Sequence, residues 1–158
     1  MRARDVMTHD VVTVAPTTPV AAIADLLVTH RINGAPVVDD DGQIIGIVTA
    51  GDLLHRAADE RFAEPGSVWK ESFWRRTSRR ASPERDRAEG RTAAEVMTRE
   101  VLTVTPETDL VTVARVLLEH DIQAVPVLTR TTLSGIISRH DILAHLAAHG
   151  GTLNPLEP

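Results

Sequence analysis

The feature that most constrains this sequence is an internal repeat, because its two ends align when one is shifted by 90 positions. The tripeptide Val6-Met7-Thr8 returns as Val96-Met97-Thr98, and Pro36-Val37 returns as Pro126-Val127. After the turn at 39–42 the shift falls to 89, and Gly46-Ile47, Asp52 and Leu54 then align with Gly135-Ile136, Asp141 and Leu143. A turn is where a one-residue insertion costs least. The chain therefore contains two copies of one folding unit.

Each copy is expected to fold as β-α-β-β-α, which predicts an α/β (α+β) protein. Runs of β-branched and apolar residues predict the strands, at 11–14, 35–38 and 44–48 in the first copy and 101–104, 125–128 and 133–137 in the second. Between the first two strands, apolar spacing of i, i+3, i+4 and i+7 predicts a helix, with Thr18 and Thr108 as N-caps. A second helix is expected near Asp52 and near Asp141. One unit of about 55 residues buries little apolar surface alone, so the two are expected to pack face to face.

Aromatic residues set the middle of the chain apart. They make up 3% of the sequence, and they are Phe62, Trp69, Phe73 and Trp74. The expected organisation is a first copy at 1–58, an arm at 59–91, a second copy at 92–149 and a tail at 150–158. The two copies must therefore form their cores from aliphatic side chains.

The arm is also basic, with a local balance of +4 between Arg61 and Arg91, whereas the flanks together carry −9. Three interpretations remain open. The aromatic residues pack onto the module or across a dimer, which we favour, or they form a docking or lid element that responds to ligand. Alternatively, the basic and aromatic mixture contacts nucleic acid or an anionic membrane. The acidic flanks make nucleic-acid binding by the copies unfavourable.

The repeated pieces resemble the CBS domain, and their tandem arrangement resembles a CBS pair, or Bateman module. The pieces are Val6-Met7-Thr8, Ala35-Pro36-Val37-Val38 and Gly46-Ile47-Val48-Thr49-Ala50-Gly51-Asp52, with partners Val96-Met97-Thr98, Val125-Pro126-Val127-Leu128 and Gly135-Ile136-Ile137-Ser138-Arg139-His140-Asp141. The resemblance implies two repeats related by pseudo-twofold symmetry, often paired into homodimers. It also implies that the clefts between repeats bind adenine nucleotides or related adenosyl ligands. A freestanding CBS-pair protein is the expectation.

Carried over residue by residue, the resemblance implies two nucleotide-binding clefts. One combines Thr18, Ile32, Asn33 and Gly34 with Gln123, Ser138, His140 and Asp141. The other combines Thr49, Gly51 and Asp52 with Thr108, Ile122, Gln123 and Ala124. A helix N-terminus favours phosphate, a hydroxyl can donate to it, and a carboxylate can accept from ribose hydroxyls. Some relatives place His or Arg near the positions of Asn33 and Gln123, and the neutral amides here favour an AMP-like ligand over triphosphates such as ATP.

Other interpretations compete with ligand binding. Asp52 and Asp141 could each cap a helix. His140, His145 and His149 could suggest a metal, but they lack an acidic partner at suitable spacing, and no metal site is predicted. The chain has no cysteine, no phosphate-binding glycine loop and no nucleophile elbow, so no catalysis and no cofactor are expected.

The functional prediction is a regulatory sensor in signal transduction that binds an adenine nucleotide. The alternative is an interaction module that acts on a protein or nucleic acid through an arm at 62–80 without a nucleotide. Partners are expected to be the ligand, a second copy and an unknown effector protein, with nucleic acid less favoured. The apolar runs are too short for a membrane span, and the first residues lack the apolar core of a signal peptide, so a cytoplasmic location is expected.

Overall fold

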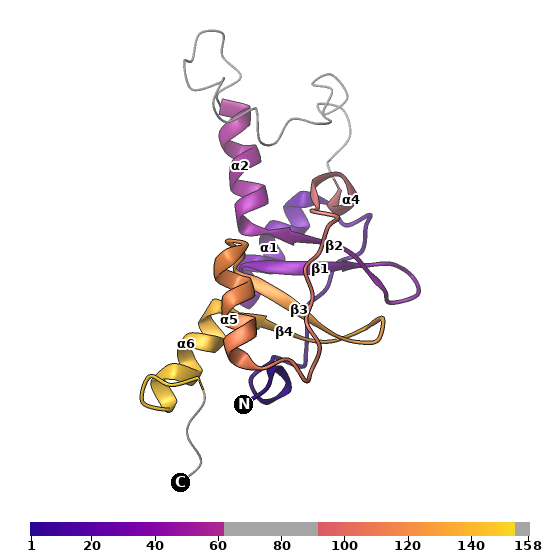
Figure 1. The fold of residues 1–158 in the computed structure, drawn as a ribbon. Coiled ribbons are helices and arrows are strands. Elements are labelled where there is room, and N and C mark those ends of the chain that lie inside the picture. The colour runs from indigo at the N-terminus through magenta and orange to yellow at the C-terminus, as the bar shows by residue number, and fades with distance from the viewer. Residues whose placement is uncertain (62–91, 154–158) are drawn as a thin grey trace.

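The computed structural model describes residues 1–61 and 92–153 (Figure 1). The first repeat contains the 3-10 helix η1 (Ala3–Asp5), α1 (Val20–His30), β1 (Gly34–Val38), β2 (Ile44–Thr49) and α2 (Ala50–Arg61). The second contains α4 (Ala93–Val96), α5 (Leu110–Glu119), β3 (Ala124–Thr129), β4 (Thr132–Ser138) and α6 (Arg139–Ala148). The same order of helices and strands in both repeats confirms the predicted α+β class.

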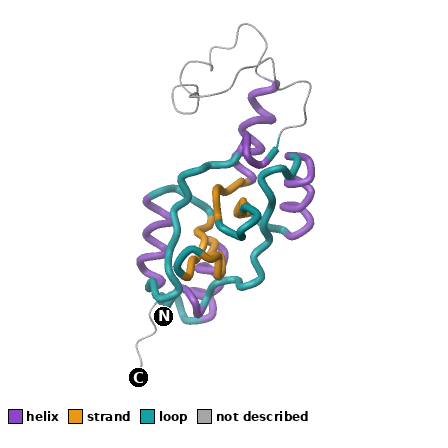
Figure 2. Tube along the Cα trace, turned by 90° about the vertical axis from the view of Figure 1, so that its right-hand side faces the viewer, coloured by secondary structure: helices purple, strands orange, loops and turns teal. Residues whose placement is uncertain are grey.

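Two antiparallel hairpins form the centre of the molecule. Strand β1 pairs with β2, and β3 pairs with β4. Figure 2 shows the strands in the middle and the helices around them. Val37 and Val48 in one hairpin, and Val127 and Ile137 in the other, are fully buried. Their apolar side chains form the base on which the helices pack, because burial of such side chains is the main favourable term in folding.

The strands expected at 11–14 and 101–104 are not formed, and this part of the prediction was wrong. Each segment makes a single parallel bridge, Val14 to Val37 and Val104 to Val127. Just before each segment, the chain pairs with the other repeat instead, at Thr8 with Ile136 and at Thr98 with Ile47. Since the chain passes from one repeat's hairpin to the other within a few residues, neither pairing can extend into a strand.

The predicted caps of the helices α1 and α5 are displaced by one residue. The N-cap of α1 is Pro19, which has no side-chain acceptor, and the N-cap of α5 is Asp109, whose carboxylate accepts from Thr112 N–H at 2.9 Å. Thr18 and Thr108 lie one residue earlier. Their hydroxyl oxygens accept from the backbone N–H of the residue three positions before, at 3.0 and 3.1 Å. Both threonines therefore close the turn that leads into the helix.

The repeats exchange their first segments. Ala3, with Val6 and Met7 beside it, packs into the core of the second repeat, while 93–97 packs into the core of the first. The glycines of β2 and β4 make this possible. A Cβ at Gly135 would lie 2.6 Å from Met7 Sδ and 3.0 Å from Thr8 O, and a Cβ at Gly46 would overlap Met97 Sδ. Each core is therefore completed by residues from the other repeat.

No helix within 1–61 and 92–153 is long and apolar enough to cross a membrane. The four aromatic residues of the expected interaction arm, Phe62, Trp69, Phe73 and Trp74, lie outside the described residues.

Candidate ligand-binding cleft

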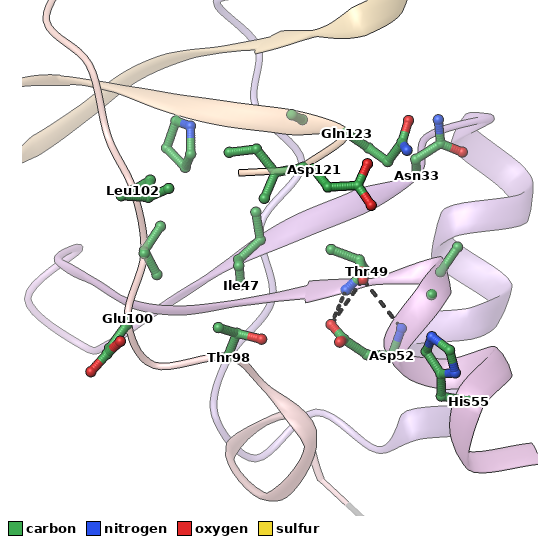
Figure 3. Close-up of a pocket in the computed structure, with 16 residues that line it drawn as sticks. Asn33, Ile47, Thr49, Asp52, His55, Thr98, Glu100, Leu102, Asp121 and Gln123 are labelled. Carbon is green, nitrogen blue, oxygen red and sulfur yellow. Dashed lines mark hydrogen bonds between the residues drawn. The ribbon is translucent and has the colours of Figure 1, made fainter. Parts of the chain in front are cut away.

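A cleft of about 520 Å³ opens between the two repeats (Figure 3). Its volume falls within the range typical of small-molecule sites. The lining comes from the end of β2 and the start of α2, from the turn before β3, and from the segment between α4 and α5. The lining residues are Asn33, Ile47, Thr49, Ala50, Gly51, Asp52, His55, Thr98, Glu100, Val101, Leu102, Asp121, Ile122, Gln123, Ala124 and Pro126.

The first wall is the junction of β2 and α2, which a capping box holds. The Asp52 carboxylate accepts through Oδ2 from the Thr49 backbone N–H at 2.8 Å and from the Thr49 hydroxyl at 2.9 Å. In return, the Asp52 N–H donates to Thr49 Oγ1 at 3.2 Å. Asp52 is thus the third residue of α2, which is the position that a capping box requires for its acidic residue, and it is not the N-cap. The box fixes a carboxylate and a hydroxyl at the cleft, where both can meet a ligand.

The second wall is the turn from α5 into β3. Asp121 adopts a left-handed conformation with φ of 49°, and Ile122, Gln123 and Ala124 follow it along the cleft. The Arg139 side chain holds this turn. Its guanidinium donates to the Ile122 carbonyl at 2.9 Å, to the Leu117 carbonyl at 3.0 Å and to the Asp121 carboxylate at 3.0 Å.

The third wall is the segment from Thr98 to Leu102, which is placed by the exchange between repeats. Ile47 N–H donates to the Thr98 carbonyl at 3.0 Å, and Thr98 N–H donates to the Ile47 carbonyl at 2.9 Å. These two bonds lay the apolar side chains of Val101 and Leu102 along the cleft. The cleft is therefore built from both repeats, with one wall from the first and two from the second.

Half of the residues expected at nucleotide sites line this cleft. They are Asn33, Thr49, Gly51, Asp52, Ile122, Gln123 and Ala124. The others lie outside its lining, namely Thr18, Ile32, Gly34, Thr108, Ser138, His140 and Asp141. Ser138 and Asp141 form the second capping box, in which Oδ2 of Asp141 accepts from the Ser138 N–H and hydroxyl, each at 2.7 Å.

Sequence reasoning missed nine lining residues, which are Ile47, Ala50, His55, Thr98, Glu100, Val101, Leu102, Asp121 and Pro126. Pairing between Ile47 and Thr98 places most of this wall, and no local pattern in the sequence announces a bond between segments 51 residues apart. The repeated Val-Met-Thr tripeptide was the available signal. Its recurrence indicates that both copies use the tripeptide in the same way, but it does not indicate that each copy pairs with the hairpin of the other repeat.

Among the described histidines, His145 is the buried one. Its ring stacks on His149 with centroids 4.0 Å apart, and its Nε2 has no hydrogen-bond partner. Burial is the main cause that lowers the pKa of His145, with the charge of His149 second. Within 1–61 and 92–153, no three side chains of the metal-binding types gather in one place.

Comparison with known proteins places the chain in a family. The CBS domain matches it twice, over residues 3–59 and 93–148, and the chain therefore belongs to the CBS-domain family. A chloroplastic CBS domain-containing protein of Arabidopsis thaliana, CBSX1, is 32% identical over 144 residues, which is 85% of this chain and 58% of that protein. The uncharacterized protein MJ1426 of Methanocaldococcus jannaschii is 47% identical over 53 residues, 34% of this chain and 32% of that protein. This chain thus spans little more than half of CBSX1 and a third of MJ1426.

Solved structures share the fold. The CBS pair of protein MJ0100, crystallised with 5′-methylthioadenosine and S-adenosyl-L-methionine, superposes with a TM-score of 0.72 at 22% identity, over 94% of this chain and 97% of that one. CBSX2 in complex with AMP superposes with a TM-score of 0.70 at 26% identity, over 93% of this chain and 96% of that one.

Proposed function

We propose that this chain is a regulatory module that binds an adenosyl ligand in the cleft between its repeats, without catalysis. The observation that carries the proposal is the position of Asp52 and Thr49, which are fixed by their capping box at the mouth of a cleft with apolar walls. Ile47, Leu102 and Ile122 offer apolar surface to a purine ring. Asp52, already held through Oδ2, can accept from the two ribose hydroxyls.

Two relatives support this choice of ligand class. The MJ0100 structure contains 5′-methylthioadenosine and S-adenosyl-L-methionine, and the CBSX2 structure contains AMP. A ligand in this cleft would touch both repeats at once. It would therefore favour whichever arrangement of the repeats it binds more tightly. Unequal affinity for two arrangements is the property that lets a ligand shift the protein from one to the other.

The test is calorimetric titration of the full chain with AMP, ATP, 5′-methylthioadenosine and S-adenosyl-L-methionine. Asp52→Ala should weaken binding about 10- to 150-fold, the equivalent of losing about 1.5–3 kcal/mol of charged hydrogen bonding. Asp141→Ala is the matched control for this cleft, because it removes the same capping carboxylate from α6, outside the lining. A lower stoichiometry in Asp141→Ala would instead reveal ligand at the other cleft that the sequence predicts. Equal affinity in wild type and Asp52→Ala would contradict the proposed role of Asp52. No binding of any of the four ligands would favour the interaction module acting through 62–80.

We also propose that the module pairs with a second copy through its helices. Four large apolar side chains are exposed at equivalent positions of the two repeats, which are Val28 (77%) with Leu118 (69%), and Leu54 (69%) with Leu143 (62%). Large apolar side chains that stay exposed on a folded protein are typical of an interaction site where they gather on one face. Because the two repeats present the same pattern, a second copy of the chain can meet both pairs in one closed arrangement.

Light scattering tests this pairing. Leu54→Glu with Leu143→Glu should convert a dimer to a monomer, because two charges would be buried on each side of the contact. Ala22→Glu is the control, since this exposed residue of α1 lies six positions before Val28 and points about 120° away from it. A wild-type mass equal to one chain would contradict the pairing.

A further inference from the structure

The cleft carries an unusual charge for a site that would hold a phosphate. Three carboxylates line it, those of Asp52, Glu100 and Asp121. Among the lining residues, none is Lys or Arg, and His55 is the one residue that can become cationic. The neutral amides Asn33 and Gln123 favour an AMP-like ligand over a triphosphate, but the carboxylates of Glu100 and Asp121 also face the cleft.

The carboxylates approach the ligand-binding end from opposite sides. In Figure 3, Asp121 and Asp52 lie on either side of Thr49, one from the turn before β3 and one from α2, while Glu100 lies at the far end. Thr49 and Asp52 are tied to each other. A 5′ substituent bound beside a ribose at Asp52 would therefore lie in the field of both carboxylates.

The Arg139 guanidinium, which pairs with Asp121, does not cancel this field within the cleft. Arg139 reaches Asp121 at 3.0 Å, but it is not among the lining residues. Its guanidinium is also committed to the Leu117 and Ile122 carbonyls. The Asp121 side chain is 93% exposed, so water weakens both its pair with Arg139 and its repulsion of a bound phosphate.

We infer that this cleft selects adenosyl ligands whose 5′ substituent is uncharged or cationic, such as a thioether or a sulfonium, over those with a 5′-phosphate. This rests on the proposed function. A phosphate adds up to two negative charges beside Asp52 and Asp121, and each such pair near a protein surface is unfavourable by an amount that changes affinity several-fold. A sulfonium reverses the sign of the same interaction.

The experiment is titration of the full chain with 5′-methylthioadenosine, S-adenosyl-L-methionine and AMP. Each titration is run at about 20 mM and at about 500 mM salt, because the higher concentration screens interactions between charges. The decisive variant is Asp121→Arg. Arg31 occupies the equivalent position of the first repeat with φ of 54°, so this backbone is known to hold an arginine in the same conformation. Asp121→Asn is the milder variant, because Asn tolerates the left-handed region well. Asp40→Asn, in the exposed turn between β1 and β2, controls for net charge alone.

Wild type should bind the thioether and the sulfonium at least about tenfold more tightly than AMP at low salt. This difference in affinity between either ligand and AMP should become smaller at high salt, and the change should be largest for the sulfonium. It should also narrow about tenfold in Asp121→Arg, less in Asp121→Asn, and not in Asp40→Asn. Equal or tighter binding of AMP in wild type, or a gap that neither salt nor Asp121→Arg changes, would overturn the inference and leave the adenosyl site intact. Binding of none of the three would overturn the adenosyl site and this inference together.

Discussion

Arg31 in the first repeat and Asp121 in the second occupy the same left-handed position after α1 and α5, with φ of 54° and 49°. Their side chains carry opposite charge on the same backbone. The residue that opens the following helix differs as well, since α2 begins with Ala50 and α6 with Arg139. Arg139 binds the turn of its own repeat through three hydrogen bonds, whereas the methyl side chain of Ala50 has no hydrogen-bond donor.

This difference teaches that the repeat is a property of the backbone and of the core, while the chemistry of the two halves has diverged. Ala50 N–H donates to the Asn33 carbonyl and Arg139 N–H to the Gln123 carbonyl, at 2.7 and 2.9 Å. The main-chain bond and the capping box of the junction are therefore shared, whereas the side chain that contacts the turn is not. The cleft has one wall whose turn is clamped by an arginine, whereas among residues 1–61 and 92–153 no side chain clamps the turn at Arg31 in the same way.

The largest expected effect comes from the exchanged segments. Gly135→Ala and Gly46→Ala should each destabilise the protein by roughly 1–3 kcal/mol, the cost of overpacking a core. Gly135→Ala should lower the stability more, because its new Cβ would meet the Thr8 backbone oxygen at 3.0 Å. At Gly46 all three close atoms belong to the Met97 side chain, which can move more easily than backbone.

Urea denaturation of the full chain measures both glycine variants. A second substitution, Met97→Ala, should restore part of the stability of Gly46→Ala by making room for the Cβ, and Met7→Ala should restore less for Gly135→Ala. If the two glycine variants were equally stable, the contact with the Thr8 backbone oxygen would contribute nothing to the loss of stability. The two exchanged segments would then tolerate a Cβ equally well.

An intermediate effect is expected at the clamp on the second repeat. Arg139→Ala should cost about 1–2 kcal/mol, because it leaves the Ile122 and Leu117 carbonyls without a charged donor in a half-buried place. Arg139→Lys should recover little of this, since an ammonium cannot reproduce the forked geometry of the guanidinium. Arg115→Ala, which removes an exposed arginine of α5, is the control.

Hydrogen exchange makes the clamp prediction specific to one repeat. The amides of 121–124 should exchange faster in Arg139→Ala, while those of 31–34 should keep their wild-type rates. Unchanged exchange at 121–124 would show that the turn is held by its backbone alone, and the contrast between the two repeats would then lose its physical basis.

The smallest effect is expected at the helix caps. Hydrogen bonds from the Thr112 side chain and then its backbone lower the pKa of Asp109 from its usual value of 3.8. A carboxyl whose pKa is lower in the folded state stabilises the fold above the unfolded pKa, and this contribution is lost as the pH falls through the folded value. Asp109→Asn keeps an acceptor but removes the charge.

The urea midpoint of Asp109→Asn should therefore lie slightly below that of wild type at pH 7, and the two should converge as the pH falls through the lowered pKa of Asp109. The first repeat has no such group, because the N-cap of α1 is Pro19. A difference that persists unchanged at low pH would assign the effect to hydrogen-bond geometry and not to charge.

The sequence allowed the second and third strands and both main helices of each repeat to be predicted, because apolar periodicity and turn residues act over a few positions. Through the resemblance to the family, the sequence also predicted that Thr49, Asp52 and Gln123 line a ligand-binding cleft. The first strands were wrong for a non-local reason, since Thr8 and Thr98 pair with the opposite repeat. The N-cap at Thr18 failed because its hydroxyl closes the preceding turn through Ala15.

By itself, then, the sequence determined that there are two copies of one unit, with aliphatic cores and a Thr or Ser three residues before an Asp at each strand-to-helix junction. Tertiary structure alone decided which segment completes which core, and with it the third wall of the cleft from Thr98 to Leu102. It also brought Asp52 and Asp121 to opposite sides of one cavity. Charges that are 69 positions apart in the chain act on a common ligand only when folding brings them within the range of Coulomb forces.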